Sequence, residues 1–413
     1  MPLLSRLRPA QALVHDAVDA TTYLVGEGHD SAARSVVGAL SKVPALEAPA
    51  KVVDSVRHTI THGVLSSVRG VNRLVEGVSG VALSGLPEHE EPAVPLRSDA
   101  VVTTEGAVDQ LVGVLNGAVG DHLSDSENGL DLGLRLRHED RWLNPSSPCV
   151  PNATKRVVVL VHGLSTTELS WSLQADEGLG SPELNYGELL RRELGYTPLF
   201  VRYNTGRTVE DNGRALAEAL DTLLDAWPVE LEELVLIGHS MGGLVARAST
   251  SARCAHRWRA LLTHLICLGS PHAGAPLARF GERAAQVCNA VDLPLTQIVG
   301  RILSHRSAGV KELQHRRLDA CGPLLPHVRY LFVAGSVTTD PDVIGTQWLG
   351  DLLVPVESAH DPKGIQVQVR HVGRVMHHRL QTDAGVWAAV RDHVRGVPGL
   401  GPAPAPSTPA AVA

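Results

Sequence analysis

Two hydrophobic periodicities divide the chain. Up to about residue 85, apolar residues recur every three or four positions, which is the period of an amphipathic helix. The clearest stripe runs through Val53, Val56, Ile60, Val64, Val68, Val71, Val75 and Val78. We therefore predict that residues 1–85 form a helical N-terminal extension. It could pack on the rest of the chain, associate with a second copy or contact a membrane surface, although its mixed charges give it no basic face.

From Arg156 onward the pattern changes to short β-branched runs separated by amphipathic segments. The runs predict strands at Arg156–His162, Pro198–Tyr203, Leu234–Ile237, His264–Leu268, Val328–Ala334 and Ile365–His371. Between them we predict helices at Glu183–Leu194, Val209–Ala226, Met241–Ser251 and Arg257–Thr263. A helix around Ala107–Leu123 and a strand around Leu130–Leu136 are expected upstream. Alternating strands and helices are typical of an α/β fold with a mostly parallel sheet covered on both faces.

Composition shifts suggest where the domains end. Residues 86–98 contain three prolines and three glutamates and are predicted to be a linker into an α/β domain at 99–396. Residues 275–325 are too long for a simple crossover, so we predict a mostly helical cap or lid insertion, either roofing a pocket or packing on itself. The Pro/Ala-rich residues 397–413 are predicted to be a disordered tail.

Charge and cysteine content narrow the function classes. The net charge of −7, from 37 basic and 44 acidic residues, gives no overall positive field for nucleic acid. The five cysteines show no C-x-x-C spacing, so we expect reduced thiols and no zinc site. The first residues lack the apolar run of a secretory signal, and no stretch is long and apolar enough to span a membrane. We therefore expect a cytoplasmic protein.

The most informative motif follows the predicted strand Leu234–Ile237. The segment Gly238-His239-Ser240-Met241-Gly242 reads G-x-S-x-G and opens the predicted helix that starts near Met241. A sharp strand-to-helix turn of this kind exposes a serine hydroxyl, and its glycines remove side chains that would collide there. The helix N-terminus also favours negative charge nearby. Ser240 is therefore a candidate nucleophile.

A second motif supplies candidate donors for an oxyanion. The buried run Val157–Val161 ends in His162-Gly163, and fixed backbone N–H groups are the best stabilisers of such an anion. We predict one donor at Met241, directly after the candidate nucleophile, and the other at Leu164. His162 is predicted to be structural and to support the loop.

The segments VVVLVHGL, LVLIGHSMGG and LICLGSPHAGAPLA resemble the α/β-hydrolase superfamily. Within it they are similar to bacterial lipase and esterase proteins grouped with the GPI inositol-deacylase-like hydrolase domain. The resemblance covers roughly residues 100–396 and leaves residues 1–98 unmatched. It implies an α/β-hydrolase fold, and it implies that Gly269-Ser270-Pro271-His272 serves packing and entry to the cap. A GPI substrate does not follow from the family name.

The resemblance also implies the acid of a catalytic triad. In this superfamily the order along the chain is Ser, then Asp or Glu, then His, so both partners should follow Ser240. Asp351 lies in GDLLVP, which resembles the G-D-x-x-V-P segment where related lipases carry their acid. Asp340, closer to the preceding strand, is the alternative, while Asp342 and Asp361 are predicted to be surface loop residues.

The base is expected in the loop before the final helix, where His377 and His378 both qualify. In the resembling family the catalytic histidine is followed by a leucine-containing turn and, nine or ten residues on, by a valine–aromatic pair. Leu380, Val386 and Trp387 fit this spacing when it is counted from His377. We predict His377 and keep His378 as the alternative.

Together these residues predict a serine carboxylic-ester hydrolase, lipase- or esterase-like, that acts through an acyl-enzyme. An acyltransferase with the same triad is one alternative. A non-catalytic hydrolase-like scaffold whose N-terminal helices bind a partner or membrane is another. The expected substrate is a small-molecule or lipid ester, with no metal and no organic cofactor. Because only 3% of residues are aromatic, a pocket lined by aliphatic side chains is expected.

Overall fold

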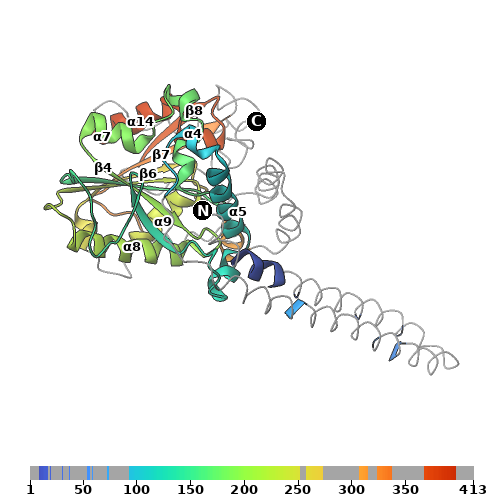
Figure 1. The fold of residues 1–413 in the computed structure, drawn as a ribbon. Coiled ribbons are helices and arrows are strands. Elements are labelled where there is room, and N and C mark those ends of the chain that lie inside the picture. The colour runs from blue at the N-terminus through green and yellow to red at the C-terminus, as the bar shows by residue number, and fades with distance from the viewer. Residues whose placement is uncertain are drawn as a thin grey trace, which may run out of the picture. The chain divides into compact units, whose positions relative to one another are not determined.

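A computed structural model gives the fold of the chain (Figure 1). It describes residues 93–251, 257–272, 307–314, 323–336 and 367–396, and in the N-terminal part residues 9–16, 19, 30, 37, 54, 55, 58, 72 and 73. Two compact units are present, Met1–Glu91 with Asn128–Leu130, and Pro92–Glu127 with Asp131–Ala413. The second unit contains the sheet and the candidate catalytic motifs.

An eight-stranded sheet in the order β2-β1-β4-β3-β5-β6-β7-β8 forms the centre of the second unit. Its strands are β1 (Leu134–His138), β2 (Arg141–Leu143), β3 (Arg156–Val161), β4 (Thr197–Tyr203), β5 (Glu233–His239), β6 (Leu262–Leu268), β7 (Arg329–Ser336) and β8 (Val367–Gly373). Strands β3 to β8 pair in parallel, whereas β1 is antiparallel to both β2 and β4. The carboxyl ends of the parallel strands therefore share one edge of the sheet.

Helices cover both faces of this sheet (Figure 1). The helical segments are α4 (Ser98–Val101), α5 (Thr104–Asp125), η1 (Glu168–Ser172), α6 (Ala175–Leu179), α7 (Tyr186–Leu194), α8 (Val209–Asp225), α9 (Met241–Ser249), η2 (Arg257–Ala260), α12 (Ala308–Gln314), η5 (His377–Gln381) and α14 (Ala384–Arg395). One face packs against α8 and α9, and the other against α7 and α14.

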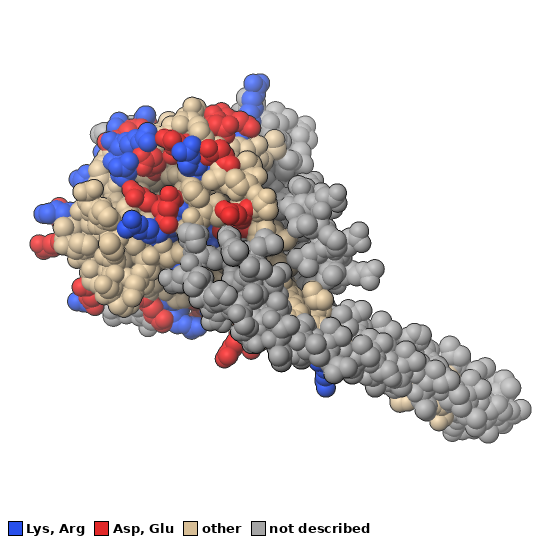
Figure 2. Space-filling view, in the orientation of Figure 1, with Lys and Arg blue, Asp and Glu red and all other residues tan. Residues whose placement is uncertain are grey.

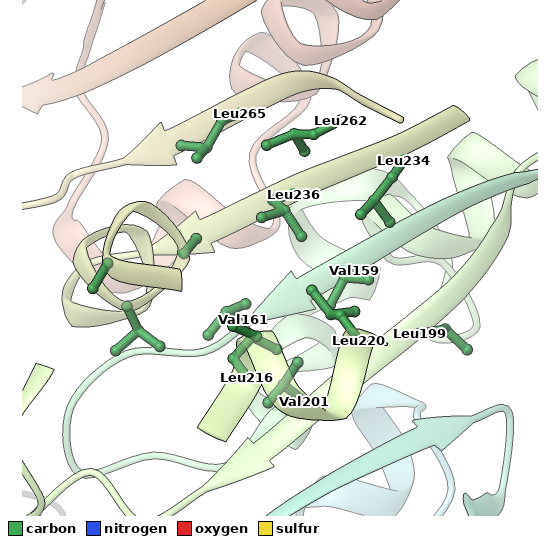
Figure 3. Close-up of a cluster of buried hydrophobic side chains, with 14 of the residues drawn as sticks. Val159, Val161, Leu199, Val201, Leu216, Leu220, Leu234, Leu236, Leu262 and Leu265 are labelled. Carbon is green, nitrogen blue, oxygen red and sulfur yellow. The ribbon is translucent and has the colours of Figure 1, made fainter. Parts of the chain in front are cut away.

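Strand β3 shows why the strands read as continuous apolar runs. Val157, Val159 and Val161 join the core on the α8 side, where Figure 3 shows Val159 and Val161 beside Leu216 and Leu220 of α8. Val158 and Leu160 join the core on the other side. Because successive side chains point to opposite faces, a strand buried on both faces must be apolar at every position.

Helix α5 is attached to the loops at the carboxyl edge of the sheet. The Asn204 side chain, just after β4, donates to the Gly120 carbonyl at 2.7 Å. Helix α12 begins beside α5, because the Ser307 hydroxyl donates to the Gly117 carbonyl and the Ala308 N–H donates to Asp121. α12 is the described helix within the predicted insertion 275–325.

In the N-terminal unit, the described residues before Glu91 are helical. The His15 ring and the Asn72 side chain form a 2.6 Å hydrogen bond, and His58 lies 3.9 Å from Asp30. His15 pairs with Asn72, and Asp30, further along the first segment, pairs with His58, which lies earlier in the second. This order of contacts indicates that the two segments run antiparallel. The valine stripe of residues 53–78 and the tail at 397–413 fall almost entirely outside the described residues, and the domain limits stay predictions.

The α/β-hydrolase fold predicted from the sequence is confirmed, with two local corrections. The helix predicted at Arg257–Thr263 is wrong, because only the short turn η2 forms and β6 starts at Leu262. The buried Trp258 of that turn donates its indole N–H to the Ala217 carbonyl of α8. The strand predicted at Leu130–Leu136 is displaced to β1, because Gly133, at φ +54°, turns the chain just before it.

The surface of the second unit carries both signs of charge. Figure 2 shows acidic and basic groups interspersed over the face that it presents. Exposed pairs such as Arg97 with Asp99 and Arg97 with Glu183 bring the two signs within 2.9 Å. Within the described residues, no helix is both long enough and apolar enough to cross a membrane.

Candidate active site

Ser240 lies in a strained turn between β5 and α9. Its backbone has φ +53° and ψ −124°, a region that residues other than glycine rarely adopt. The Ser240 N–H donates to the Leu268 carbonyl of β6 at 2.8 Å, and its carbonyl accepts from the Gly243 N–H at 3.1 Å. The turn is therefore held by the sheet on one side and by the first turn of α9 on the other.

The two glycines of the motif are required by packing. A Cβ atom on Gly238 would lie 2.3 Å from the Gly243 nitrogen. A Cβ atom on Gly242 would lie 2.3 Å from the carbonyl oxygens of both Val161 and His162. No side chain fits at such distances, so the G-x-S-x-G pattern allows α9 to cross closely over the end of β3.

The loop after β3 lies against this turn. A Cβ atom on Gly163 would lie 3.1 Å from the Ser240 Cβ and 3.0 Å from the His239 ring nitrogen Nδ1. The structure thus brings Gly163, and with it the adjoining Leu164, next to Ser240 and Met241. This is the neighbourhood in which two backbone donors for an oxyanion are needed.

His162 supports this loop as a neutral side chain. Its ring stacks on Tyr203 with centroids 4.5 Å apart, and its Nδ1 lies 2.9 Å from the Gly163 carbonyl oxygen, to which it donates. Burial lowers the pKa of His162 to about 4. The Thr166 hydroxyl also donates to the Gly163 carbonyl at 2.9 Å, so two side chains fix the peptide that precedes Leu164.

A buried charge cluster continues the same loop. Glu168, four residues after Leu164, accepts hydrogen bonds from Arg137 of β1 at 2.7 Å and from Arg202 of β4 at 2.6 Å. Arg202 also donates to Asp109 of α5 at 2.6 Å. Burial opposes ionisation of Glu168, but the two guanidinium groups outweigh it and lower the pKa of this carboxyl to about 2.

The candidate base lies on the other side of the elbow. His377 is buried and starts η5, whereas His378 is half-buried. The His239 ring nitrogen Nε2 lies 2.9 Å from the His377 carbonyl oxygen, and the two ring centroids are 4.7 Å apart. His377 therefore lies beside the residue that directly precedes Ser240.

Buried neutral contacts hold the segment that carries His377, and a partly exposed ion pair joins its Arg379 to Glu177 at 3.2 Å. The buried Tyr186 hydroxyl lies 3.0 Å from the Leu380 carbonyl oxygen and 2.8 Å from that of Asp383. The Gln381 side chain donates to the Ser170 hydroxyl at 3.0 Å. The Tyr186 ring also lies between Trp171 and Trp387, with centroid distances of 6.1 and 5.6 Å.

The structure thus brings four of the five predicted site residues, Ser240, Met241, Leu164 and His377, to one place on the carboxyl edge of the sheet. Asp351 and its alternative Asp340 lie outside the described residues, as do Asp342 and Asp361. Among the described residues no three His, Cys, Asp or Glu side chains are grouped as metal ligands.

Two features of this region were missed in the sequence. The Arg137–Glu168–Arg202–Asp109 cluster joins residues far apart in the chain, and no local motif announces it. His239 occupies a variable position of G-x-S-x-G, so the motif assigns it no role. Its only sequence signal is a polar residue at the end of an apolar strand.

The strand–turn–helix at Ser240, on a mostly parallel sheet covered on both faces, defines the class of the protein as an α/β-hydrolase fold. The sequence matches a family model described as a PGAP1-like alpha/beta domain over residues 201–298, from β4 through the elbow and beyond. The chain therefore resembles the α/β-hydrolase superfamily. No curated protein matches the sequence.

Several solved structures are similar to the chain. The mature lipase BlEst2 from Bacillus licheniformis is 18% identical, with a TM-score of 0.40, over 63% of this chain and 96% of that one. The esterase Pf2001 from Pyrococcus furiosus is 16% identical, with a TM-score of 0.38, over 64% of this chain and 90% of that one. The peroxisomal alpha-beta-hydrolase Lpx1 from Saccharomyces cerevisiae is 13% identical, with a TM-score of 0.33, over 60% and 80%.

Proposed function

We propose that this protein is a serine ester hydrolase. The observation that supports it most is the conformation of Ser240, a non-glycine residue at φ +53° between β5 and α9. Strain at such a position costs about 1–3 kcal/mol and persists where function requires the geometry. Two further contacts support the proposal: the loop of Gly163 borders Ser240, and the segment of His377 contacts the adjoining His239.

In the proposed reaction, His377 accepts the proton of the Ser240 hydroxyl as the serine oxygen attacks the ester carbonyl. The backbone N–H groups of Leu164 and Met241 would stabilise the resulting oxyanion, each contributing roughly 3–4 kcal/mol in the transition state. The imidazolium then gives its proton to the departing alcohol. A water molecule, deprotonated by His377, releases the acid from the acyl-enzyme and restores the serine.

Asp351 is proposed to orient His377 and to stabilise its protonated form, a role carried over from the GDLLVP segment. For the substrate we propose a small-molecule or lipid ester with an aliphatic acyl chain, because the chain contains few aromatic residues to line a pocket. Transfer of the acyl group from the acyl-enzyme to water, rather than to an added alcohol, is the simplest outcome. The ratio of acid to transferred ester in the presence of added alcohol measures it.

Covalent labelling tests the proposal directly. A fluorophosphonate probe reacts with an activated serine, so the wild-type protein should be labelled and Ser240→Ala should not be. The same substitution should abolish hydrolysis of p-nitrophenyl butyrate. Ser249→Ala is the matched control, since Ser249 is a buried serine on α9 that donates to the Ala246 carbonyl. A wild-type protein that is not labelled, or labelling that survives Ser240→Ala, contradicts the proposal.

A further inference from the structure

His239 lies at the point where the three parts of the candidate site meet. It is the last residue of β5 and is bonded in the chain to Ser240. It is 4% exposed. Its imidazole contacts the segment of the candidate base and the loop of the candidate oxyanion donors, so a single side chain borders all three parts.

The contact with the base segment fixes the proton on the His239 ring. Nε2 lies 2.9 Å from the His377 carbonyl oxygen. A carbonyl oxygen can only accept a hydrogen bond, so Nε2 carries a hydrogen and donates it. The bond joins the end of β5 to the first residue of η5, which are 138 positions apart in the sequence.

The rings of His239 and His377 also touch. Their centroids are 4.7 Å apart and their planes are inclined by 48°. On another side, a Cβ atom on Gly163 would lie 3.0 Å from Nδ1 of His239. The His239 imidazole therefore lies between the candidate base and the candidate oxyanion loop, where its position affects both.

We propose that His239 is a positioning residue for His377, acting through the hydrogen bond from its Nε2 to the His377 carbonyl and through the contact between the two rings. The role rests on the proposed function. The bond ties the backbone of His377 to the strand that carries Ser240, and the ring contact limits the rotation of the His377 imidazole. Both effects keep the base aligned with the nucleophile, and misplacement by about 1 Å can cost on the order of 100-fold in rate.

Three substitutions separate this role from simple packing. The Gln side chain places an amide N–H near the position of a histidine Nε2–H, whereas the Asn amide is too short. His239→Leu fills a similar space without a donor. We expect His239→Leu and His239→Asn to lower kcat for p-nitrophenyl butyrate by about 10- to 100-fold with little change in KM. His239→Gln should restore most of the lost kcat.

A buried histidine elsewhere provides the control. His138 of β1 donates from Nδ1 to the Pro198 carbonyl at 2.9 Å, near the amino end of β4 and away from Ser240. His138→Leu removes the same kind of hydrogen bond and should lower thermal stability. It should leave kcat and the fluorophosphonate labelling rate of the remaining folded protein near the wild-type values.

The labelling rates distinguish the two proposals. If wild-type protein is not labelled at Ser240, the proposed function fails and this role fails with it. If wild-type protein is labelled and His239→Leu is labelled equally fast, only the role of His239 is wrong. Equal kcat values for His239→Gln and His239→Asn would also overturn it. Slow labelling and low kcat in the Leu and Asn variants, with recovery in Gln, support it.

Discussion

The loop after β3 borders Ser240 and the segment η5 contacts the adjoining His239, but different kinds of interaction hold them. The β3 loop, residues 162–168, ends in Glu168, whose carboxylate is buried between two guanidinium groups. Segment η5 is held by the Tyr186 hydroxyl, an amide-to-hydroxyl hydrogen bond and packed aromatic rings. Buried charge anchors one side of the candidate site. The buried contacts on the other side are neutral, and its ion pair, Arg379 with Glu177, has an exposed carboxylate.

The difference has a physical consequence. Burying charges is costly, and removing one member of a buried charge pair typically costs about 3–5 kcal/mol because the other member is left uncompensated. Losing a neutral hydrogen bond costs only about 1 kcal/mol. The β3 loop is therefore held in one arrangement, as preorganised oxyanion donors require. Segment η5 carries the candidate base, and its anchors can be altered separately.

Glu168→Gln should give the largest effect, because it leaves Arg137 and Arg202 with a neutral partner. We expect a loss of about 3–5 kcal/mol in the free energy of unfolding, measured by urea denaturation at pH 7. The labelling rate at Ser240 should also fall, since the loop of Leu164 loses its anchor.

The control is Glu232→Gln on the surface. Glu232 pairs with Lys155 at 2.6 Å, but both side chains are more than half exposed, at 58% and 57%. Exposed pairs contribute at most about 1 kcal/mol. If Glu168→Gln lowered the free energy of unfolding by no more than Glu232→Gln does, the buried cluster would not be what holds the loop in place.

Lowering the pH should neutralise Glu168 and weaken its hold on the β3 loop, whereas the hydrogen bonds of Tyr186 to η5 should not change. Arg202 and Arg137 lower the pKa of Glu168 to about 2 against the burial that opposes ionisation, while the unfolded value is 4.5. Because the folded pKa is depressed, the contribution of Glu168 is complete above the unfolded pKa and is lost as the pH falls from 4.5 towards 2. That loss is about 3 kcal/mol.

The difference in unfolding free energy between wild type and Glu168→Gln should therefore stay constant from pH 7 to pH 5 and then shrink. Urea denaturation at several pH values measures it. The corresponding difference for Tyr186→Phe should not change over the same range. A Glu168→Gln difference that stayed constant down to pH 3 would show that the carboxyl group is not held ionised by the two arginines.

Tyr186→Phe should give the smallest effect. It removes the hydroxyl beside the Leu380 and Asp383 carbonyls while the ring keeps its place between Trp171 and Trp387. We expect a loss of about 1 kcal/mol in unfolding free energy, together with a lower kcat because η5 carries His377.

Tyr330→Phe is the matched control for Tyr186→Phe. The Tyr330 hydroxyl accepts a hydrogen bond from the Leu325 N–H at 2.8 Å, near the start of β7 and away from Ser240. Tyr330→Phe should lower the free energy of unfolding by about as much as Tyr186→Phe, without changing kcat. Equal kcat values for the two variants would mean that the neutral anchors of η5 do not matter to the reaction.

Much of the fold could be predicted because the signals were local. The six parallel strands and the helices α5, α7, α8 and α9 were found from apolar runs and helical periodicity, although their ends moved by a few residues. The failures came from contacts that apolar runs and helical periodicity do not record. Trp258 of η2 packs against α8, and the short strand β2 (Arg141–Leu143) forms only because β1 lies beside it.

The candidate site also combines parts that local sequence signals predict with parts that they do not. The elbow at Ser240 and the loop before Leu164 could be predicted because a turn and its neighbours in sequence suffice to define them, whereas the catalytic roles of Ser240, Met241 and Leu164 stay predictions. The preference for His377 over His378 rests on the spacing of the resembling family and stays a prediction, while the structure shows His377 buried beside His239. Asp351 stays a prediction, since the described residues do not include it.

The sequence by itself determined the order of the strands and helices, the elbow at Ser240 and the loop of His162-Gly163, because backbone conformation and burial pattern are encoded in neighbouring residues. Only the tertiary structure decided which side chains fix those pieces. Asp109, Arg137, Glu168 and Arg202 form a cluster, and His239 meets His377, because the sheet brings together strand ends that are far apart in the chain. Contacts of this kind depend on distance in space, which no local pattern records.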